Sequence, residues 1–252
     1  MWAERQAIEV FHLLFLRSFG ARVDKALFAL KGGCNLRFYH RSIRYSEDMD
    51  LDIRTLAPGT LRSNVDAVLT ADALRHSLRA QKIEIVGATA PKQTSMTQRW
   101  KIALRLADQR GNIPTKIEFS RRALDPGAAV AAVEPELIAR YRLYPVIVQH
   151  YESAAALAQK ISALALRSET QARDIFDIDL LLNAGAAPAS LPKAQQELLP
   201  AAIANALTIG FDEFVGQVVA YLEPDHQADF ASRASWGRLQ EKVVDALQAL
   251  KS

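Results

Sequence analysis

ALKGGCNLRFYHRSIRYSEDMDLDI, residues 29–53, carries a glycine pair and, after it, an alternating run of aspartates. The side chains of a β-strand point alternately to opposite faces of the sheet. The run therefore predicts a strand whose apolar residues enter the core, namely Met49, Leu51 and Ile53. Its acids line the other face: Asp48, Asp50 and Asp52.

These acids need positive charge near them. Two ionised carboxylates about 4 Å apart in an effective dielectric of about 20 repel by roughly 4 kcal/mol, and aspartate is a poor strand former. Mg²⁺ answers this need, because it is commonly held by one or two carboxylates together with substrate phosphates. A calcium EF-hand is excluded, because the loop positions that require glycine and glutamate hold Ile53 and Gly59 in this chain. A solvated sheet face is the alternative, above all for Asp52.

The glycine pair, Gly32 and Gly33, suits a phosphate. Backbone without side chains lets N–H groups approach phosphate oxygens closely, especially where a helix starts just after the loop. Lys31 adds positive charge. A glycine pair alone is more often a tight turn, but its combination with the acidic strand favours a nucleotide site.

A third acid, Glu118, lies in a second alternating segment. Residues 99–120 form two alternating runs joined by a turn-rich linker, which predicts a β-hairpin. Glu118 faces the aspartates if its strand pairs beside theirs; otherwise it lies on an exposed strand face. Three basic residues lie at alternating positions of the first run: Arg99, Lys101 and Arg105. Their face of the strand either follows a nucleic-acid phosphate backbone or is a plain solvent-facing side.

The pattern of elements predicts an α+β fold. Residues 3–19 have helical spacing with Gly20 as the stop, residues 64–80 read as helix, and residues 82–86 as strand. After about residue 123 the chain becomes a Pro/Gly/Ala connector, and from about residue 150 nearly every segment is helical. We expect a domain with a mixed or antiparallel sheet over residues 1–147 and a helical domain over residues 148–252 that contributes to the active-site cleft.

Composition excludes several classes of protein. The chain has 252 residues, half of them apolar, and a net charge of +3, which is weak support for a polyanionic partner. Cys34 is the single cysteine, so an internal disulfide and a cysteine-rich zinc site are excluded, and the five histidines lack ligand spacing. The apolar run before Arg17 is far short of the roughly 20 residues that cross a bilayer. A cytoplasmic protein is expected.

The sequence resembles the AbiEii/AbiGii-type nucleotidyltransferase toxins, a branch of the DNA polymerase β-like nucleotidyltransferase superfamily. LKGGCNLRFYHRSIRYSEDMDL is similar to the family signature K-G-G-T-x-L…R-x-S-x-D-I-D-L, including the step from Arg44 to Ser46. KISALALRSETQARDIFDIDLL is similar to K-x-x-A-L…R-D-x-x-D. Matching positions there are Lys160, Ala163, Leu164, Arg173, Asp174 and Asp177. The resemblance covers residues 28–182, and Cys34 replaces the usual small hydroxyl residue.

The resemblance implies a polymerase β-like nucleotidyltransferase domain followed by a helical domain. The implied metal ligands are Asp48, Asp50 and Glu118, of which Glu118 is alternatively the base for the incoming hydroxyl. The implied catalytic residues are these three with Lys160 and Asp174. The implied nucleotide-binding residues are Lys31, Gly32, Gly33, Ser46 and Arg173.

Lys160 and Asp174 share a site only if the helix between them breaks. At 1.5 Å per residue, a continuous helix would separate them by about 21 Å. We expect the segment SETQA, residues 168–172, to end the first helix, with Ser168 or Thr170 capping the next. The alternative is that Arg173 and Asp174 form a surface pair at a helix start.

The implied activity is metal-dependent nucleotidyl transfer of the EC 2.7.7 type. With Mg²⁺ or Mn²⁺, the enzyme would transfer a nucleotide from ATP, GTP or CTP to RNA, at the 3′ end of tRNA, or to a protein hydroxyl, releasing pyrophosphate. The resemblance also implies a toxin with an antitoxin encoded nearby, for which direct contact is not required. A catalytically idle nucleotide-sensing or partner-binding module is the alternative, although the intact acids argue against it.

Overall fold

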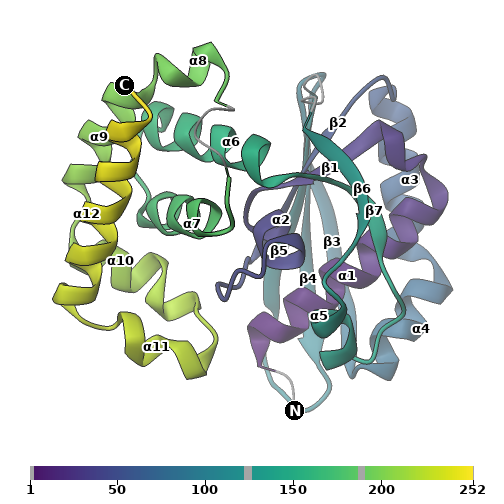
Figure 1. The fold of residues 1–252 in the computed structure, drawn as a ribbon. Helices are drawn as coiled ribbons and strands as arrows, with labels where there is room; N and C mark the ends of the chain where they lie inside the picture. Colours follow the sequence, from purple (N-terminus) through teal and green to yellow (C-terminus); the bar gives the residue numbers. More distant parts are fainter. Residues whose placement is uncertain (1–2, 122–126, 187–190, 252) are drawn as a thin grey trace. The chain divides into compact units, whose positions relative to one another are not determined.

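The computed structural model describes residues 3–121, 127–186 and 191–251 (Figure 1). The chain divides into two compact units. The first comprises Met1–Tyr39 and Tyr45–Tyr151, and the second His40–Arg44 and Glu152–Ser252. The short segment His40–Arg44 thus belongs to a different unit from the strand that follows it.

A mixed sheet forms the centre of the first unit. Its strands are β1 (Phe28–Lys31), β2 (Asp48–Ile53), β3 (Ile83–Gln93), β4 (Thr97–Leu106), β5 (Ile113–Arg121), β6 (Ala128–Ala132) and β7 (Ile147–Tyr151). Their order is β3-β4-β5-β2-β1-β7-β6. β2 pairs in parallel with β5 and β1 in parallel with β7, whereas the other neighbours are antiparallel. The predicted α+β class with a mixed sheet is confirmed, as is the hairpin of β4 and β5.

Helices cover the apolar face of this sheet. They are α1 (Glu4–Arg22), α3 (Pro58–Thr70) and α4 (Asp72–Ala80), while α2 (Gly32–Tyr39) and α5 (Pro135–Arg140) are the remaining α-helices described in the unit, which also has a short 3₁₀ helix, η1 (Lys25–Leu27). Phe19 of α1 packs against Phe119 of β5, with ring centroids 5.3 Å apart. Met49, Leu51 and Ile53 are fully buried in the same core, as predicted. Since strand neighbours alternate, the acids of β2 lie on the other face.

Two local predictions in the first unit are wrong. Gly20 does not end α1, which continues to Arg22; a Cβ on Gly20 would lie 3.1 Å from Cγ1 of Val148, so this glycine permits close packing against β7. The helical segment over residues 64–80 is two helices, because Ala71 between them is extended, with ψ of 130°.

Strands β6 and β7 occur where the sequence predicts a connector and the beginning of the helical domain. β6 has the sequence AAVAA, which lacks both alternation and β-branched enrichment, and its antiparallel pairing with β7 supplies the strand geometry. Residues 122–126 of the predicted connector lie outside the described residues.

The second unit is helical, as predicted. Its described α-helices are α6 (Ser153–Leu166), α7 (Ala172–Asn183), α8 (Lys193–Gln196), α9 (Leu199–Thr208), α10 (Phe211–Gln217), α11 (Pro224–Phe230) and α12 (Arg233–Ala249), and a short 3₁₀ helix, η3 (Val219–Tyr221), follows α10. Stacked rings of Phe214 and Trp236, with centroids 4.5 Å apart, join α10 to α12. The segment His40–Arg44 joins this unit through a β-bridge from Arg44 to Leu222 and a 2.9 Å hydrogen bond from the Glu223 N–H to the Ile43 carbonyl.

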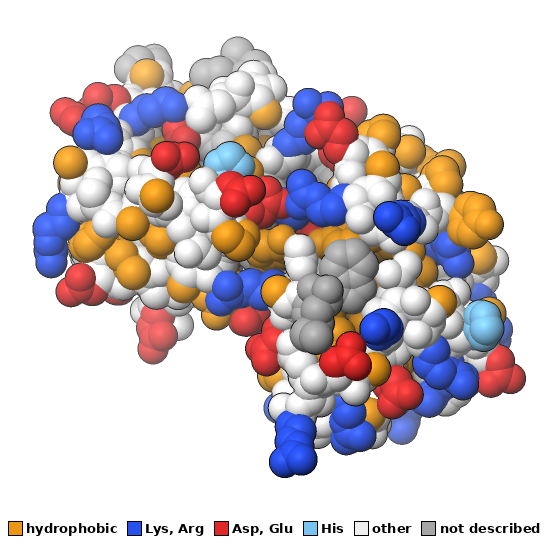
Figure 2. Space-filling model, turned by 90° about the horizontal axis from the view of Figure 1, so that it is seen from below, with side chains coloured by type: hydrophobic (Ala, Val, Ile, Leu, Met, Phe, Trp, Pro, Cys, Tyr) orange, Lys and Arg blue, Asp and Glu red, His pale blue; other side chains and the backbone are white. Residues whose placement is uncertain are grey.

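Acidic and basic side chains are interspersed over the face seen in Figure 2, in keeping with a net charge of only +3. Among the described helices, none combines the length and the apolar character that crossing a membrane requires.

Candidate active site

The acids of β2 and β5 lie side by side on the open face of the sheet. In the parallel register, Asp50 is opposite Glu118 and Asp48 is opposite Lys116. Residues opposite each other on neighbouring strands point to the same face. The prediction that Glu118 shares a face with Asp48 and Asp50 is therefore confirmed.

The glycine turn contacts this acidic row. β1 ends at Lys31, opposite Asp50, and α2 begins at once with Gly32. Gly32 has a φ of +65°, and a Cβ at this position would lie 3.2 Å from Oδ2 of Asp50. A residue other than glycine would be strained here and would crowd the carboxylate. The first turn of α2 also leaves backbone N–H groups without helical partners, which suits a phosphate.

Cationic side chains neutralise two of the acids. Lys116 Nζ lies 2.7 Å from Oδ2 of Asp48, and Arg99 Nε lies 2.5 Å from Oε2 of Glu118. Burial raises the pKa of the Asp50 carboxyl, Lys31 opposes this shift, and the charges of Glu118 and Asp48 add to it. Asp50 is thus a half-buried acid whose ionisation calls for further positive charge.

Asp52 is not the solvated acid that the sequence favours. It is buried, forms an ion pair with Lys31, and accepts a hydrogen bond of 2.9 Å from the hydroxyl of Tyr151. β2 lies between β5 and β1 in the sheet, and the side chains of Lys31 on β1 and Tyr151 on β7 contact Asp52. The solvated interpretation of Asp52 is therefore wrong, and part of the charge of Lys31 is used inside the protein.

The acidic row fits a hard divalent cation. Among the described residues, no three His, Cys, Asp or Glu side chains already converge as metal ligands. The carboxylates of Asp48 and Glu118 are paired with Lys116 and Arg99 instead. The donors are nevertheless carboxylate oxygens on one sheet face beside a glycine cradle, which is the donor type that Mg²⁺ and Mn²⁺ prefer. Both cationic side chains are partly exposed, so these ion pairs are weak and exchangeable.

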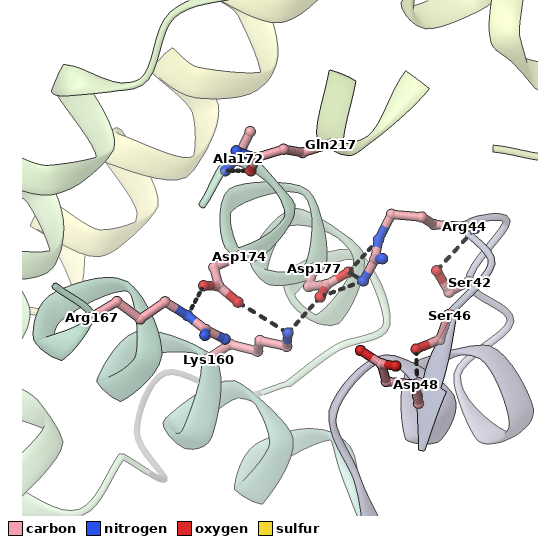
Figure 3. Close-up of polar contacts among 10 residues, drawn as sticks. All are labelled: Ser42, Arg44, Ser46, Asp48, Lys160, Arg167, Ala172, Asp174, Asp177 and Gln217. Atoms are coloured by element: carbon pink, nitrogen blue, oxygen red, sulfur yellow. Dashed lines mark hydrogen bonds and ion pairs between the residues drawn. The ribbon is translucent and has the colours of Figure 1, made fainter. Parts of the chain in front are cut away.

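The second unit carries a chain of alternating charges between α6 and α7 (Figure 3). Lys160 Nζ lies 3.1 Å from Oδ1 of Asp174 and 2.6 Å from Oδ2 of Asp177. Arg167 extends the chain at Asp174, at 2.8 Å, and Arg44 extends it at Asp177, at 3.0 Å. The prediction that Asp174 turns back toward Lys160 is confirmed, and the surface-pair alternative is wrong for Asp174, which is fully buried.

This chain of charges has three cations for two acids. Burial opposes the ionisation of Asp177, but the charges of Arg44 and Lys160 outweigh it and lower its pKa. Asp177 is therefore held as an anion by its partners, and the cluster has one more basic side chain than acidic ones. Such a cluster suits an anionic ligand.

The break between the helices occurs as predicted, but its cap is different. α6 ends at Leu166 and α7 begins at Ala172, with Gln171 as the N-cap residue. Neither Ser168 nor Thr170 caps α7; instead, the N–H of Ala172 donates to Oε1 of Gln217, on α10, at 2.8 Å (Figure 3). A cap from 45 residues downstream has no local sequence signal.

Comparison with known proteins identifies the family. A model of the family described as "Nucleotidyl transferase AbiEii toxin, Type IV TA system" matches residues 14–250. The chain belongs to the AbiEii family. It is thus a member of a family of nucleotidyltransferase toxins of type IV toxin–antitoxin systems, and this family implies an antitoxin partner. The family predicted from the sequence is confirmed.

Two solved structures from Helicobacter pylori share the fold of this AbiEii family member. JHP933 has a TM-score of 0.58 and 17% identity over 97% of this chain and 94% of its own. An H. pylori protein provisionally described as a nucleotidyltransferase has a TM-score of 0.60 and 16% identity over 98% of both chains. A search of curated proteins found no significant match.

The remaining predicted residues of the AbiEii chain have distinct settings. Ser46 donates a hydrogen bond of 2.9 Å to the Asp48 carbonyl, so its hydroxyl contacts the main chain of the acidic strand. Arg173 is half-buried and, among the described residues, forms no ion pair. Alternation places Lys116 on the same face as Glu118, but its ion pair with Asp48 was not predicted from the sequence.

Proposed function

We propose that this AbiEii family member is a metal-dependent nucleotidyltransferase of the EC 2.7.7 type. It would transfer a nucleoside monophosphate from a nucleoside triphosphate to a hydroxyl group and release pyrophosphate. The observation that carries the proposal is the pairing of Asp50 with Glu118 across β2 and β5, beside the turn at Gly32. A site that had lost its catalytic activity would not need to retain carboxylates that repel each other. Their presence argues against a catalytically idle module.

Asp48, Asp50 and Glu118 would hold Mg²⁺ or Mn²⁺. When bound, the metal supplies Lewis-acid charge at the phosphate and the attacking oxygen. Glu118 then orients the acceptor hydroxyl and takes its proton as the oxygen–phosphorus bond forms. The bond from the α-phosphorus to the bridging oxygen breaks, and the β- and γ-phosphates leave as pyrophosphate. Lys116 and Arg99 release the carboxylates that they pair with in the free protein.

Backbone groups of Gly32 and Gly33 would bind the triphosphate, with Lys31, Ser46 and Arg173 as further nucleotide-binding residues. The turn at Gly32 supports this role because it leaves the beginning of α2 open to an anion. Placement of phosphate by fixed dipoles and charges is the main source of catalysis in phosphoryl transfer.

Lys160 would neutralise phosphate charge, and Asp174 would hold it in place through their 3.1 Å ion pair. The support is the excess positive charge of the cluster in the second unit. This assignment makes Asp174 a positioning residue, because both of its carboxylate oxygens are engaged, one by Lys160 and the other by Arg167.

A polyanionic acceptor, RNA at the 3′ end of tRNA, is favoured over a protein hydroxyl. Across neighbouring strands, Arg99 lies opposite Glu118, and Lys92 lies opposite Arg99. In the same way, Lys101 lies opposite Lys116. Basic side chains thus follow the acids on the same face of the sheet, where a sugar-phosphate backbone could lie. Transfer to protein remains the second candidate.

Transfer assays test this function directly. Purified protein is incubated with each α-labelled nucleoside triphosphate, with Mg²⁺ or Mn²⁺, and with total RNA or cell lysate. We expect labelled RNA and released pyrophosphate from the wild type, and neither product from Asp48→Ala or Lys160→Ala. Glu84→Ala and Lys193→Ala, exposed residues of like charge, serve as matched controls and should remain active. Nucleotide binding without pyrophosphate release under any metal or acceptor would support the idle module instead.

A further inference from the structure

A buried polar cluster lies directly beneath the beginning of β2. His12 of α1 is fully buried, with Nε2 2.9 Å from the hydroxyl oxygen of Thr115 and Nδ1 3.5 Å from the sulfur of Cys34. Thr115 belongs to β5 and Cys34 to α2. The cluster therefore joins three elements around the strand that carries Asp48.

The hydrogen bonds assign the tautomer of His12. The hydroxyl of Thr115 has one proton, and it donates this proton to the Glu47 carbonyl at 2.6 Å. Toward His12 it can therefore only accept, so Nε2 must carry the hydrogen. Nδ1 is then the unprotonated nitrogen, and it faces the Cys34 sulfur.

The same cluster holds two consecutive carbonyl groups of the acidic strand. Thr115 binds the carbonyl of Glu47, while the thiol of Cys34 donates to the carbonyl of Asp48 at 3.2 Å. Ser46 donates to the same carbonyl at 2.9 Å. The main chain on both sides of the Asp48 nitrogen and Cα is thereby fixed from below, while its carboxylate points to the open face.

We propose that His12 is a positioning residue: as the neutral Nε2–H tautomer it orients the Thr115 hydroxyl toward the Glu47 carbonyl and so fixes the backbone that presents Asp48. This inference rests on the proposed function in that Asp48 is taken to act at the open face. It does not depend on which nucleotide or acceptor is used.

The chemistry of the two buried groups excludes a direct catalytic part. Burial lowers the pKa of His12 to about 3, so the imidazole stays neutral and exchanges no proton in the physiological range. Burial likewise raises the pKa of the Cys34 thiol, which therefore remains protonated and unreactive. What remains for His12 is to set the direction of a hydrogen bond.

Nuclear magnetic resonance tests the tautomer. Protein labelled with ¹⁵N-histidine is compared with the same labelled protein carrying His12→Gln, which identifies the His12 signals. We expect a protonated Nε2, an unprotonated Nδ1, and no titration of this ring between about pH 5 and about pH 8. A protonated Nδ1, or a ring that titrates in that range, would overturn the proposal.

Matched variants test the positioning role. His12→Gln keeps an N–H donor at the reach of Nε2, whereas His12→Phe fills the space without one. Phe15→Leu, a core change on the same helix, controls for lost stability. We expect His12→Phe to speed amide hydrogen exchange at Asp48 and Met49, to weaken Mn²⁺ binding about tenfold and to lower kcat on the order of 10- to 100-fold, with little change in KM. His12→Gln should keep the amide exchange rates, the Mn²⁺ affinity and kcat close to those of the wild type.

The outcomes separate this inference from the proposed function. If the wild type transfers no nucleotide, the proposed function fails, while the tautomer and the exchange rates at Asp48 still decide the inference. If His12→Phe leaves exchange at Asp48 and Met49 unchanged, or Phe15→Leu raises it equally, the positioning role is wrong.

Discussion

Gly32 and Asp50 are in contact, since the place that a Cβ on Gly32 would occupy lies 3.2 Å from Oδ2 of the Asp50 carboxylate. The turn after β1 therefore meets the acidic strand without a side chain between them. Gly32 has two separate reasons to be glycine, its φ of +65° and the nearness of this carboxylate. The two reasons make different predictions for substitution.

Gly32→Ala is expected to abolish transfer, whereas Gly185→Ala is not. Gly185 has a φ of +79°, but a Cβ there meets nothing within 4 Å. Both variants should lose about 1–2 kcal/mol of unfolding free energy through backbone strain, measured by urea denaturation. Only Gly32→Ala should also lose nucleotide binding, measured by calorimetry. Equal activity of the two variants would show that the contact with Asp50 has no functional part.

Asp52 and Asp48 are expected to respond in opposite ways to alanine. Asp52→Ala leaves Lys31 and the Tyr151 hydroxyl without their buried partner and should cost about 3 kcal/mol of unfolding free energy. Asp48 and Lys116 are both more than a third exposed, so Asp48→Ala should change stability by less than about 1 kcal/mol.

Urea denaturation of both variants, with the transfer assay alongside, measures this difference. Asp48→Ala should be folded and inactive. A stable Asp52→Ala protein with normal activity would contradict the buried ion pair as a structural element.

Asp50 should make the free protein less stable as the pH rises. Its pKa is raised by burial, so the folded state binds the proton more tightly than the unfolded state does. The free energy of unfolding therefore falls as the pH rises from the unfolded pKa, near the ordinary aspartate value of 3.8, through the raised folded pKa. Asp50→Asn lacks this loss.

The measurement is urea denaturation of wild type and Asp50→Asn in metal-free buffer from about pH 4 to about pH 7. The advantage of Asp50→Asn should grow with pH and then level off, and Mn²⁺ should remove it by stabilising the wild type alone. An advantage that is constant with pH, or that shrinks as the pH rises, would contradict the raised pKa.

The parts of the site that were predictable from the sequence are those with a local signal. The alternation of β2 assigned Met49 and Asp50 to opposite faces, because a period of two residues belongs to the strand itself. The pairing of β2 with β5 places Glu118 opposite Asp50 and joins residues 68 positions apart. From the sequence alone the prediction was therefore only conditional, that Glu118 faces the aspartates if the two strands pair. The sequence of β6 has no strand pattern of its own, because the strand forms through its pairing with β7.

Side-chain partners from distant elements had no such signal. Asp52 reads as a solvated acid until Tyr151 and the pairing of β1 with β7 are known. Gln217 caps α7 from another helix, and His12 reads as one more residue of a packing helix. Each of these contacts is made by tertiary packing, which overrides local preference wherever a polar group is buried.

The basic side chains beside the acids distinguish an RNA acceptor from a protein acceptor. Lys101 lies opposite Lys116, and Lys92 lies opposite Arg99, on β4 and β3. Lys92→Glu and Lys101→Glu together should weaken transfer to RNA on the order of tenfold at about 0.1 M salt, and should flatten its salt dependence, because fewer phosphate contacts release fewer counterions. Nucleotide binding should be unchanged, and Lys193→Glu with Lys251→Glu, exposed on the second unit, is the matched control.

The measurement is the rate of RNA labelling at a series of salt concentrations, with nucleotide affinity by calorimetry. Labelling of RNA that is insensitive to both substitutions and to salt would remove this face as the acceptor surface, and labelling of protein alone would favour the second candidate acceptor.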